Sequence, residues 1–138
     1  MIDPILAEMS RLRVLLCEDE KFALKLEKMV LKQLNIEQIT VAEDGAEALR
    51  QIEERGHEFD LVISDWNMPY ITGVELLKLI RQKDNQLAFI MVTGNATLDN
   101  VKEALGNGVD AYIVKPFSLD QMRAKILSVL QKRKVVRS

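Results

Sequence analysis

Short apolar runs and longer stretches of helical periodicity take turns along the 138 residues, and this alternation narrows the choice of fold more than any other property of the chain. The apolar runs are residues 14–17, 39–42, 61–64, 88–92 and 111–114. Apart from Thr40 and Ser64 the runs are apolar throughout, and none alternates regularly with polar residues. Strands of this kind are expected to be buried on both faces, as in a parallel sheet covered by helices.

The stretches between the runs carry signals of helices. Apolar residues fall on one helix face in three of them: Phe22, Leu26, Met29 and Val30; Leu98, Val101 and Leu105; Met122, Ile126, Val129 and Leu130. Capping-box spacing marks helix starts at Asp44 with Glu47, Thr72 with Glu75 and Ser118 with Gln121. Gly56 and residues 106–108 stand where helices should end. The sequence predicts five strand-helix units in a doubly wound, three-layer α/β/α fold.

Length and composition indicate one domain. With 138 residues, 48% of them hydrophobic, the chain can fill one compact core and has no room for a second. Residues 12–133 are the predicted domain. Residues 1–11 are interpreted as a short extra helix or a loose arm, and residues 134–138 as a basic tail. The basic residues near the C-terminus are Lys132, Arg133, Lys134 and Arg137. We interpret them as favourable charges at a helix C-terminus, with contact to an anionic partner as the alternative.

Charge and cysteine content exclude several classes of function. With 19 Lys and Arg against 21 Asp and Glu, the formal net charge is -2, which favours neither nucleic acid nor an anionic membrane as partner. Cys17 is the only cysteine and lies in an apolar run, so no disulfide framework or cysteine zinc site is expected. No stretch has the pattern of a signal peptide or a membrane span. We therefore expect a soluble, cytoplasmic protein.

Polar residues that can carry chemistry follow the predicted strands. They are Glu18, Asp19 and Glu20 after the first strand, Asp65 after the third, Thr93 after the fourth and Lys115 after the fifth. In an open parallel sheet, ligands bind at the carboxyl ends of the strands. If the first and third strands are neighbours, the carboxylates of Glu18, Asp19 and Asp65 meet there and need a cation to stay ionised. A set of oxygen ligands without His or Cys suits Mg²⁺. Solvated strand ends or helix caps are the alternative for any one acid.

The remaining residues at this edge suit a phosphoryl group. A bound phosphoryl needs a hydrogen-bond donor and a fixed cation for its oxygens, which Thr93 and Lys115 can supply. Asp65 is then the carboxylate free to act as nucleophile and form an acyl phosphate. The only tryptophan, Trp66, is adjacent and should report metal binding.

Four motifs in order resemble the receiver domains of two-component response regulators, most closely the stand-alone chemotaxis type. They are the acidic pair 18–19, the block 63–69 followed by Gly73, residues 91–93 and residues 112–117. The resemblance covers about residues 12–133. It implies a flavodoxin-like sheet with strand order 2-1-3-4-5 and five helices. It also suggests a cis peptide bond before Pro116.

The resemblance implies specific roles for the motif residues. Asp65 would be the phosphoacceptor, and Asp19, Asp65 and the main-chain carbonyl of Asn67 would hold Mg²⁺ with Glu18 beside them. Thr93 and Lys115 would bind the phosphoryl group. Movement of Thr93 would let Tyr112 turn inward and repack the surface formed by the helix around residues 98–105, the strand 111–114 and the helix around 119–130.

Three departures from the family pattern affect the expected chemistry. Glu18 stands where Asp is usual, and its extra methylene can move the carboxylate into or out of the metal shell. Gly94 follows Thr93 where Ala is more common and loosens that loop. Asn67 and Asn95, each two residues beyond a site residue, are expected to tune the lifetime of the phosphoryl group.

The sequence thus predicts a non-enzymatic, single-domain response regulator, with chemotaxis or motility signalling as one setting. Its partners would be a sensor histidine kinase or phosphotransfer protein and a downstream target, with the chain a monomer or a phosphorylation-dependent dimer. One alternative is a small Mg²⁺-dependent phosphohydrolase with an aspartate nucleophile, which calls for a second Asp where Asn67 stands. The other alternative is a receiver-like scaffold that no longer takes phosphate.

Overall fold

A computed structural model describes residues 4–83, 86–95 and 97–133 and shows five strands in one parallel sheet. The strands are β1 (Arg13–Cys17), β2 (Gln38–Ala42), β3 (Leu61–Asp65), β4 (Ala88–Thr93) and β5 (Ala111–Val114). The helices are α1 (Pro4–Ser10), α2 (Lys21–Gln33), α3 (Gly45–Arg55), α4 (Gly73–Lys83), α5 (Leu98–Gly106) and α6 (Leu119–Arg133), with a 3-10 turn η1 (Gly56–Glu58). The five predicted strands are confirmed. The predicted basic tail, 134–138, lies outside the described residues.

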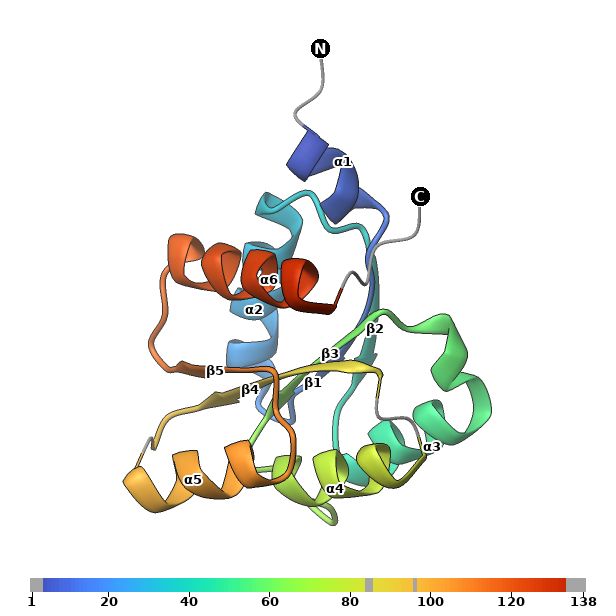
Figure 1. Ribbon diagram of the computed structural model, residues 1–138, viewed down its shortest axis with the longest axis vertical. Coiled ribbons are helices and arrows are strands. Elements are labelled where there is room, and N and C mark those ends of the chain that lie inside the picture. The colour runs from blue at the N-terminus through green and yellow to red at the C-terminus, as the bar shows by residue number, and fades with distance from the viewer. Residues whose placement is uncertain (1–3, 84–85, 96, 134–138) are drawn as a thin grey trace.

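The sheet has the predicted strand order β2-β1-β3-β4-β5, with every neighbouring pair parallel. Chain order reverses at β1, which lies between β2 and β3. Figure 1 shows α2 and α6 on one face of the sheet and α3, α4 and α5 on the other. This is the expected three-layer, doubly wound fold, with α1 as a sixth helix.

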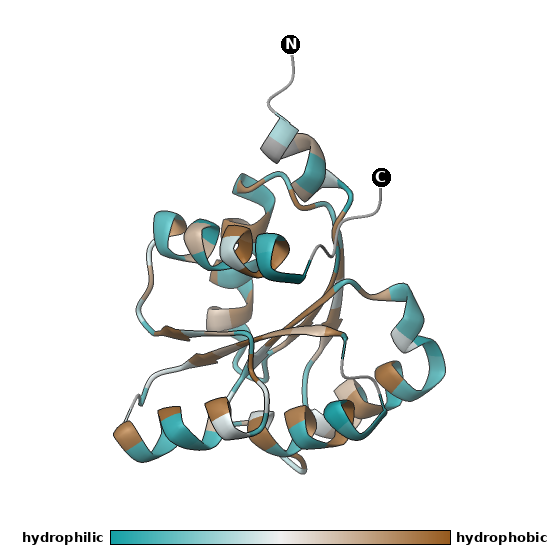
Figure 2. Ribbon diagram, in the orientation of Figure 1, coloured by the Kyte–Doolittle hydropathy of each residue, from teal (hydrophilic) through white to brown (hydrophobic). Residues whose placement is uncertain are grey.

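Alternate residues of each central strand enter two separate cores. Leu16 and Ile63 pack under α2 and α6, whereas Leu15 and Val62 pack under the other three helices. All four are at most 1% exposed, which explains why the sequence shows unbroken apolar runs. In Figure 2 the strands are mostly brown and the helices mix brown with teal, as expected for helices that cover a sheet.

The helix boundaries follow the capping signals. Thr72 and Glu75 form both hydrogen bonds of a capping box at the start of α4, and Ser118 and Gln121 do the same for α6. At α3 only half of the box forms, because the Asp44 side chain accepts from the amide of residue 47 while the Glu47 carboxylate pairs with Arg50. The Lys115–Pro116 peptide bond is cis, as the resemblance suggested.

The sequence pattern did not specify the structure of two helices, α1 and α2. Helix α1 occupies the segment for which the sequence left open a helix or an arm, and Met9 near its end is fully buried in the core under α2 and α6. On α2, Phe22 is 67% exposed and Met29 is 50% exposed, whereas Leu31 is buried. Three of the four residues of the apolar stripe, Phe22, Leu26 and Met29, therefore face away from the sheet, whereas Val30 packs against the core. None of the described helices is long and apolar enough to cross a bilayer.

Candidate phosphoryl and metal site

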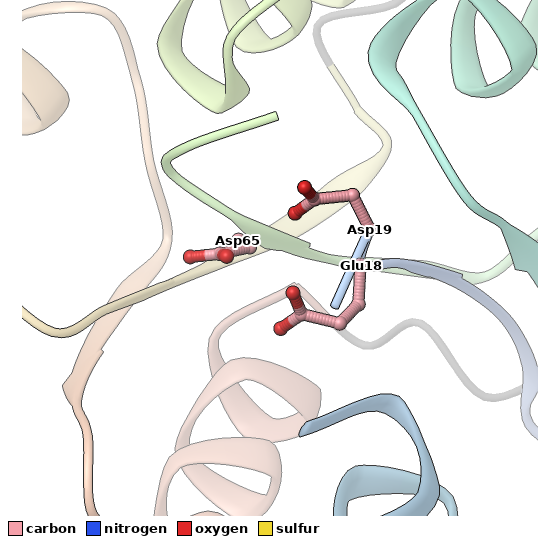
Figure 3. A group of neighbouring side chains, drawn as sticks. All are labelled: Glu18, Asp19 and Asp65. Atoms are coloured by element: carbon pink, nitrogen blue, oxygen red, sulfur yellow. The ribbon is translucent and has the colours of Figure 1, made fainter. Parts of the chain in front are cut away.

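Three carboxylates predicted at the strand ends lie together at the carboxyl edge of the sheet. Glu18 and Asp19 follow β1 and Asp65 ends β3, and the pairing of Cys17 with Ser64 brings the two strand ends level. One carboxylate oxygen from each acid lies within 4.8 Å of the other two. Figure 3 shows Glu18 and Asp19 leaving the end of β1 on opposite sides, with the Asp65 carboxylate between them. Glu18 and Asp65 are buried and Asp19 is exposed, so the group opens to solvent beside Asp19.

Lys115 brings one ammonium group to these acids. Its Nζ lies 2.8 Å from Glu18 Oε1 and 3.4 Å from Asp65 Oδ2. The backbone fixes where this side chain emerges, because the Lys115 amide donates to the Thr93 carbonyl oxygen at 2.7 Å, just beyond the last β4–β5 pair. Burial would lower the pKa of Lys115, but the hydrogen bond to Glu18 and the surrounding carboxylates raise it, so the side chain is a fixed cation.

Burial and neighbouring charges shift the pKa values of the acids in the site. Burial, and next the Glu18 carboxylate, raise the pKa of Asp65 to about 6, although Lys115 opposes this. Burial also acts to raise the pKa of Glu18, but hydrogen bonds with Lys115 and Glu27 and from the Glu20 amide outweigh it and lower that pKa. One lysine does not balance these carboxylates. The surplus charge and the oxygen-only ligand set fit a small divalent cation.

A fourth acid, Glu27, belongs to this cluster and was missed by sequence reasoning. It lies on α2, is only 4% exposed, and places Oε2 3.8 Å from Lys115 Nζ. Burial and the contact with Glu18 raise the pKa of Glu27 to about 9. The available signal was helical spacing, because Glu27 shares its α2 face with Leu31, four residues later and buried. A charged residue on the inward face of a helix calls for a partner.

Glu20, in contrast, is part of a helix cap. Its carboxylate accepts hydrogen bonds from the amides of Phe22 and Ala23 and caps the start of α2. It is exposed and outside the group that can share an ion. For this one acid the helix-cap alternative is the correct reading.

Thr93 and Tyr112 lie next to each other on β4 and β5. Thr93 is 1% exposed, and its hydroxyl oxygen accepts a hydrogen bond from the Asn95 amide at 3.1 Å. The Tyr112 hydroxyl is buried and has no hydrogen-bond partner among the described residues, and burial raises its pKa. The Tyr112 ring meets Trp66 edge-on, with centroids 6.5 Å apart.

A close backbone approach shapes the loop that follows Asp65. The Gly73 amide donates to the Trp66 carbonyl oxygen at 2.7 Å, and a Cβ on Gly73 would lie 2.3 Å from the Asp65 carbonyl oxygen. Only glycine fits there, which accounts for its place at the end of the motif. Asn67 and Asn95 are exposed at the rim of the site.

An apolar groove of about 520 Å³ opens beside Lys115. Its walls come from α2 and from the segment after β5, and they include Phe22, Leu26, Met29, Pro116 and Phe117. The exposed apolar stripe of α2 is thus one wall of a groove that ends next to the acidic cluster.

Comparison with known proteins assigns the family. The model of the response regulator receiver domain matches residues 14–127, so the chain belongs to the receiver family. The family consists of signalling modules and not of enzymes that turn over a separate substrate.

Several of the relatives are chemotaxis proteins or are described as CheY-like. The chemotaxis protein CheY of Pseudomonas aeruginosa is 32% identical over 123 residues, which make up 88% of this chain and 98% of that protein. A CheY-like receiver domain protein from Methanospirillum hungatei JF-1 has a TM-score of 0.80 and 32% identity, covering 89% of this chain and 96% of its own. The CheX–CheY–BeF3–Mg²⁺ complex from Borrelia burgdorferi gives a TM-score of 0.82 at 27% identity, covering 86% and 89%.

Proposed function

We propose that this receiver accepts a phosphoryl group on Asp65 in a Mg²⁺-dependent reaction and thereby regulates a target protein. The observation that carries the proposal is the convergence of three carboxylates and one ammonium group at the switch point of the sheet. Asp19, Asp65 and the main-chain carbonyl of Asn67 would hold the ion, with Glu18 beside them. Bound Mg²⁺ would offset the negative charge of the incoming phosphoryl oxygens.

The chain's own residues would carry out the transfer as follows. An oxygen of the Asp65 carboxylate attacks phosphorus, and the bond between phosphorus and the donor breaks. With a phosphohistidine donor, the breaking P–N bond leaves its electron pair on the imidazole. Lys115 would pair with one phosphoryl oxygen and Thr93 would donate its hydroxyl hydrogen to another. Asn67 and Asn95 remain the residues predicted to tune the lifetime of the product.

The partly buried Tyr112 supports a switch. In this proposal Thr93 moves toward the phosphoryl group and Tyr112 repacks against it, which changes the surface of α5, β5 and α6. That surface already exposes Leu98, Leu105 and Val114. Its occupant would be the downstream target, which buries these apolar side chains when the site is phosphorylated.

The groove beside Lys115 suits the phosphodonor, a histidine kinase or phosphotransfer protein. A donor must bring its phosphoryl group to Asp65, and the groove reaches Lys115, whose Nζ lies 3.4 Å from Asp65 Oδ2. Its apolar stripe runs along α2 beside a parallel stripe of Lys21, Lys25, Lys28 and Lys32. The occupant that complements both stripes is a helix with apolar residues bordered by acidic ones.

Two alternative functions are less well supported. A phosphohydrolase needs a second acid after the nucleophile, and Asn67 is neutral at that position. A scaffold that no longer takes phosphate has no use for a buried carboxylate with a pKa raised to about 6 beside a fixed cation. A cytoplasmic location remains a prediction, as does the oligomeric state, which is either a monomer or a phosphorylation-dependent dimer.

Phosphorylation by acetyl phosphate tests the proposal. Mg²⁺ should quench Trp66 fluorescence, and the donor should then add one acid-labile phosphoryl group, detected by intact-mass measurement. Asp65→Asn should abolish the addition, whereas the control Asp120→Asn, an exposed acid on α6, should leave it unchanged. Labelling that persists in Asp65→Asn would show that another residue is the acceptor.

The groove is tested with a protein donor. Leu26→Ser should slow transfer from a phosphohistidine protein by about tenfold and leave the rate with acetyl phosphate unchanged. Equal slowing with both donors would mean that α2 shapes the site and does not dock the donor.

A further inference from the structure

The connection from β2 to α3, residues 42–45, has backbone contacts with two other segments at the carboxyl edge. The Ala42 carbonyl oxygen accepts from the Glu18 amide at 3.0 Å, one bond beyond the paired residues of β1 and β2. The Gly45 amide donates to the Pro69 carbonyl oxygen at 3.2 Å. Glu18 begins the segment after β1, and Pro69 lies in the β3–α4 loop, residues 66–72. One short connection is therefore bonded to both segments that follow the central strands, and none of the roles above accounts for it.

Gly45 approaches the β3–α4 loop more closely than any other residue type could. A Cβ at position 45 would lie 1.9 Å from the Ile71 carbonyl oxygen and 2.6 Å from the Ile71 Cβ. Contacts of a Cβ below 3.0 Å essentially do not occur. A side chain at this position would therefore have to displace the Ile71 carbonyl oxygen by roughly 1 Å.

The helix is held more firmly than the loop in this contact. The Asp44 carboxylate caps α3 by accepting from the Glu47 amide at 2.7 Å. Ala48 and Ile52 anchor the helix in the core under α3, α4 and α5, at 0% and 8% exposure. In the loop, by contrast, Tyr70 is 84% exposed. Overpacking at position 45 is therefore expected to move the loop and leave the helix in place.

The β3–α4 loop is closed by its own hydrogen bonds, so a shift at Ile71 reaches its other end. The Ile71 amide donates to the Pro69 carbonyl oxygen at 2.8 Å, in a three-residue turn. The Gly73 amide, at the start of α4, donates to the Trp66 carbonyl oxygen at 2.7 Å. Asn67, whose main-chain carbonyl is the expected Mg²⁺ ligand, lies between these bonded residues. A displacement of the loop at Ile71 therefore also displaces Asn67.

We propose that Gly45 is a positioning residue of the site: its close approach seats the β3–α4 loop against α3 and thereby sets where the Asn67 carbonyl lies relative to the carboxylates. The bond from the Glu18 amide holds the start of the segment that carries Asp19 to the same connection. This inference rests on the proposed function, in which Asp19, Asp65 and the Asn67 carbonyl hold Mg²⁺. Mg²⁺ requires nearly ideal octahedral geometry, so its binding is sensitive to a displacement of one ligand by about 1 Å.

Gly45→Ala tests this role through the affinity for Mg²⁺, measured by isothermal titration calorimetry with no phosphodonor present. We expect about tenfold weaker binding, because the loop has to retreat from the added methyl group. Gly56→Ala is the matched control at the other end of α3, where a Cβ would meet only Ile52 Cγ2 at an ordinary 3.5 Å. This variant should bind Mg²⁺ within about twofold of the original protein.

A second control separates positioning from loss of stability. Ile52→Ala removes a buried side chain from the same helix, two turns beyond Gly45, and should lower the urea concentration at which the protein unfolds. Its Mg²⁺ affinity, measured without urea, should nevertheless stay within about twofold of the original. A merely structural role for Gly45 predicts that affinity follows stability in all variants. A positioning role predicts that only Gly45→Ala binds weakly.

Amide hydrogen exchange tests the role in the original protein, even if Gly45→Ala does not fold. If Mg²⁺ and the Gly45 contact both fix the loop, each must strengthen the other. Saturating Mg²⁺ should therefore slow exchange of the Gly45 amide by at least about threefold more than it slows exchange of the Asp60 amide. The Asp60 amide, bonded to the Arg13 carbonyl oxygen at the amino end of the strands, is the control for overall stabilisation.

The outcomes separate this inference from the proposed function. If the original protein binds Mg²⁺ and folded Gly45→Ala binds it equally well, the positioning role is wrong and the metal site stands. An equal loss of affinity in Ile52→Ala, or equal slowing of the Gly45 and Asp60 amides, would also contradict the role. If the original protein binds no Mg²⁺, the proposed metal site fails and the role of Gly45 fails with it.

Discussion

The two edges of the sheet treat buried carboxylates in opposite ways. At the amino edge, Asp60 lies just before β3 and forms a bidentate ion pair with the guanidinium group of Arg13. It also accepts a hydrogen bond from the Arg13 amide. Asp110, just before β5, pairs with Arg81 and Arg133. At the carboxyl edge, the group of Glu18, Asp19 and Asp65 faces a single ammonium, and Asp19 has no ion pair among the described residues.

This difference separates structural from functional charge. Asp60 has one guanidinium partner and Asp110 has two, and each also accepts from a backbone amide, so their charge is neutralised inside the protein. The carboxyl edge is left with surplus negative charge, which no further cation among the described residues neutralises. A buried acid by itself therefore says little about function. The balance of charge around it is the informative quantity.

The largest expected effect is at the amino edge. Asp110→Ala should lower the free energy of unfolding by about 3 kcal/mol, because Arg81 and Arg133 lose their buried counter-ion and the Phe89 amide loses its acceptor. Urea unfolding followed by circular dichroism measures the loss. Mg²⁺ affinity should stay unchanged. If Asp110→Ala were as stable as the original protein, the ion pairs of Asp110 with Arg81 and Arg133 would not be important for stability.

At the carboxyl edge, removing an acid should stabilise the protein. The pKa of Asp65 is raised to about 6, so the folded state holds its proton more tightly than the unfolded chain does. As pH rises from about 4 to 6, the unfolded chain releases that proton first and stability falls. With EDTA present, Asp65→Asn should therefore be more stable at pH 7 by on the order of 2 kcal/mol, and no more stable below about pH 4.

Urea unfolding at several pH values measures this effect, and Mg²⁺ provides its control. Adding Mg²⁺ should stabilise the original protein and narrow its difference from Asp65→Asn, because the ion binds only where the carboxylate remains. A destabilised Asp65→Asn protein at pH 7 in EDTA would mean that the Lys115 ion pair outweighs burial, and that the two edges are electrostatically alike.

The strands and helices could be predicted from the sequence better than the balance of charge around the carboxyl-edge acids. Continuous apolar runs and capping boxes are local signals, so the strands and the starts of α3, α4 and α6 could be found without coordinates. Glu18, Asp19 and Asp65 were found because parallel strands end at one edge. Glu27 was missed because its partners, Glu18 and Lys115, lie 9 and 88 residues away along the chain, and helical spacing alone does not identify them.

The outward stripe of α2 was unpredictable for a related reason. Phe22, Leu26 and Met29 have the spacing of a core face, yet the sheet packs against the side that carries Leu31. Periodicity shows that a helix has an apolar stripe but not what covers it.

The smallest expected effects concern one glycine at each edge. Gly94 follows β4 at the carboxyl edge, and a Cβ there would meet nothing within 4 Å. Gly108 precedes β5 at the amino edge, has φ +87 and would place a Cβ 3.1 Å from Arg81 Nε. Gly94→Ala should raise the free energy of unfolding by about 0.5 kcal/mol because it restricts the unfolded chain, whereas Gly108→Ala should lower it by about 1 kcal/mol because alanine is strained at positive φ.

The two glycine variants should also differ in function: only Gly94→Ala should change the rate of phosphorylation. Gly94→Ala stiffens the loop that carries the Asn95 amide, which donates to the Thr93 hydroxyl, so the phosphorylation rate with acetyl phosphate should change although the protein is more stable. Gly108→Ala should leave that rate unchanged in the folded protein, because the strain lies at the far end of β5. An unchanged rate for Gly94→Ala, measured with both variants fully folded, would show that this loop does not need to move for the transfer.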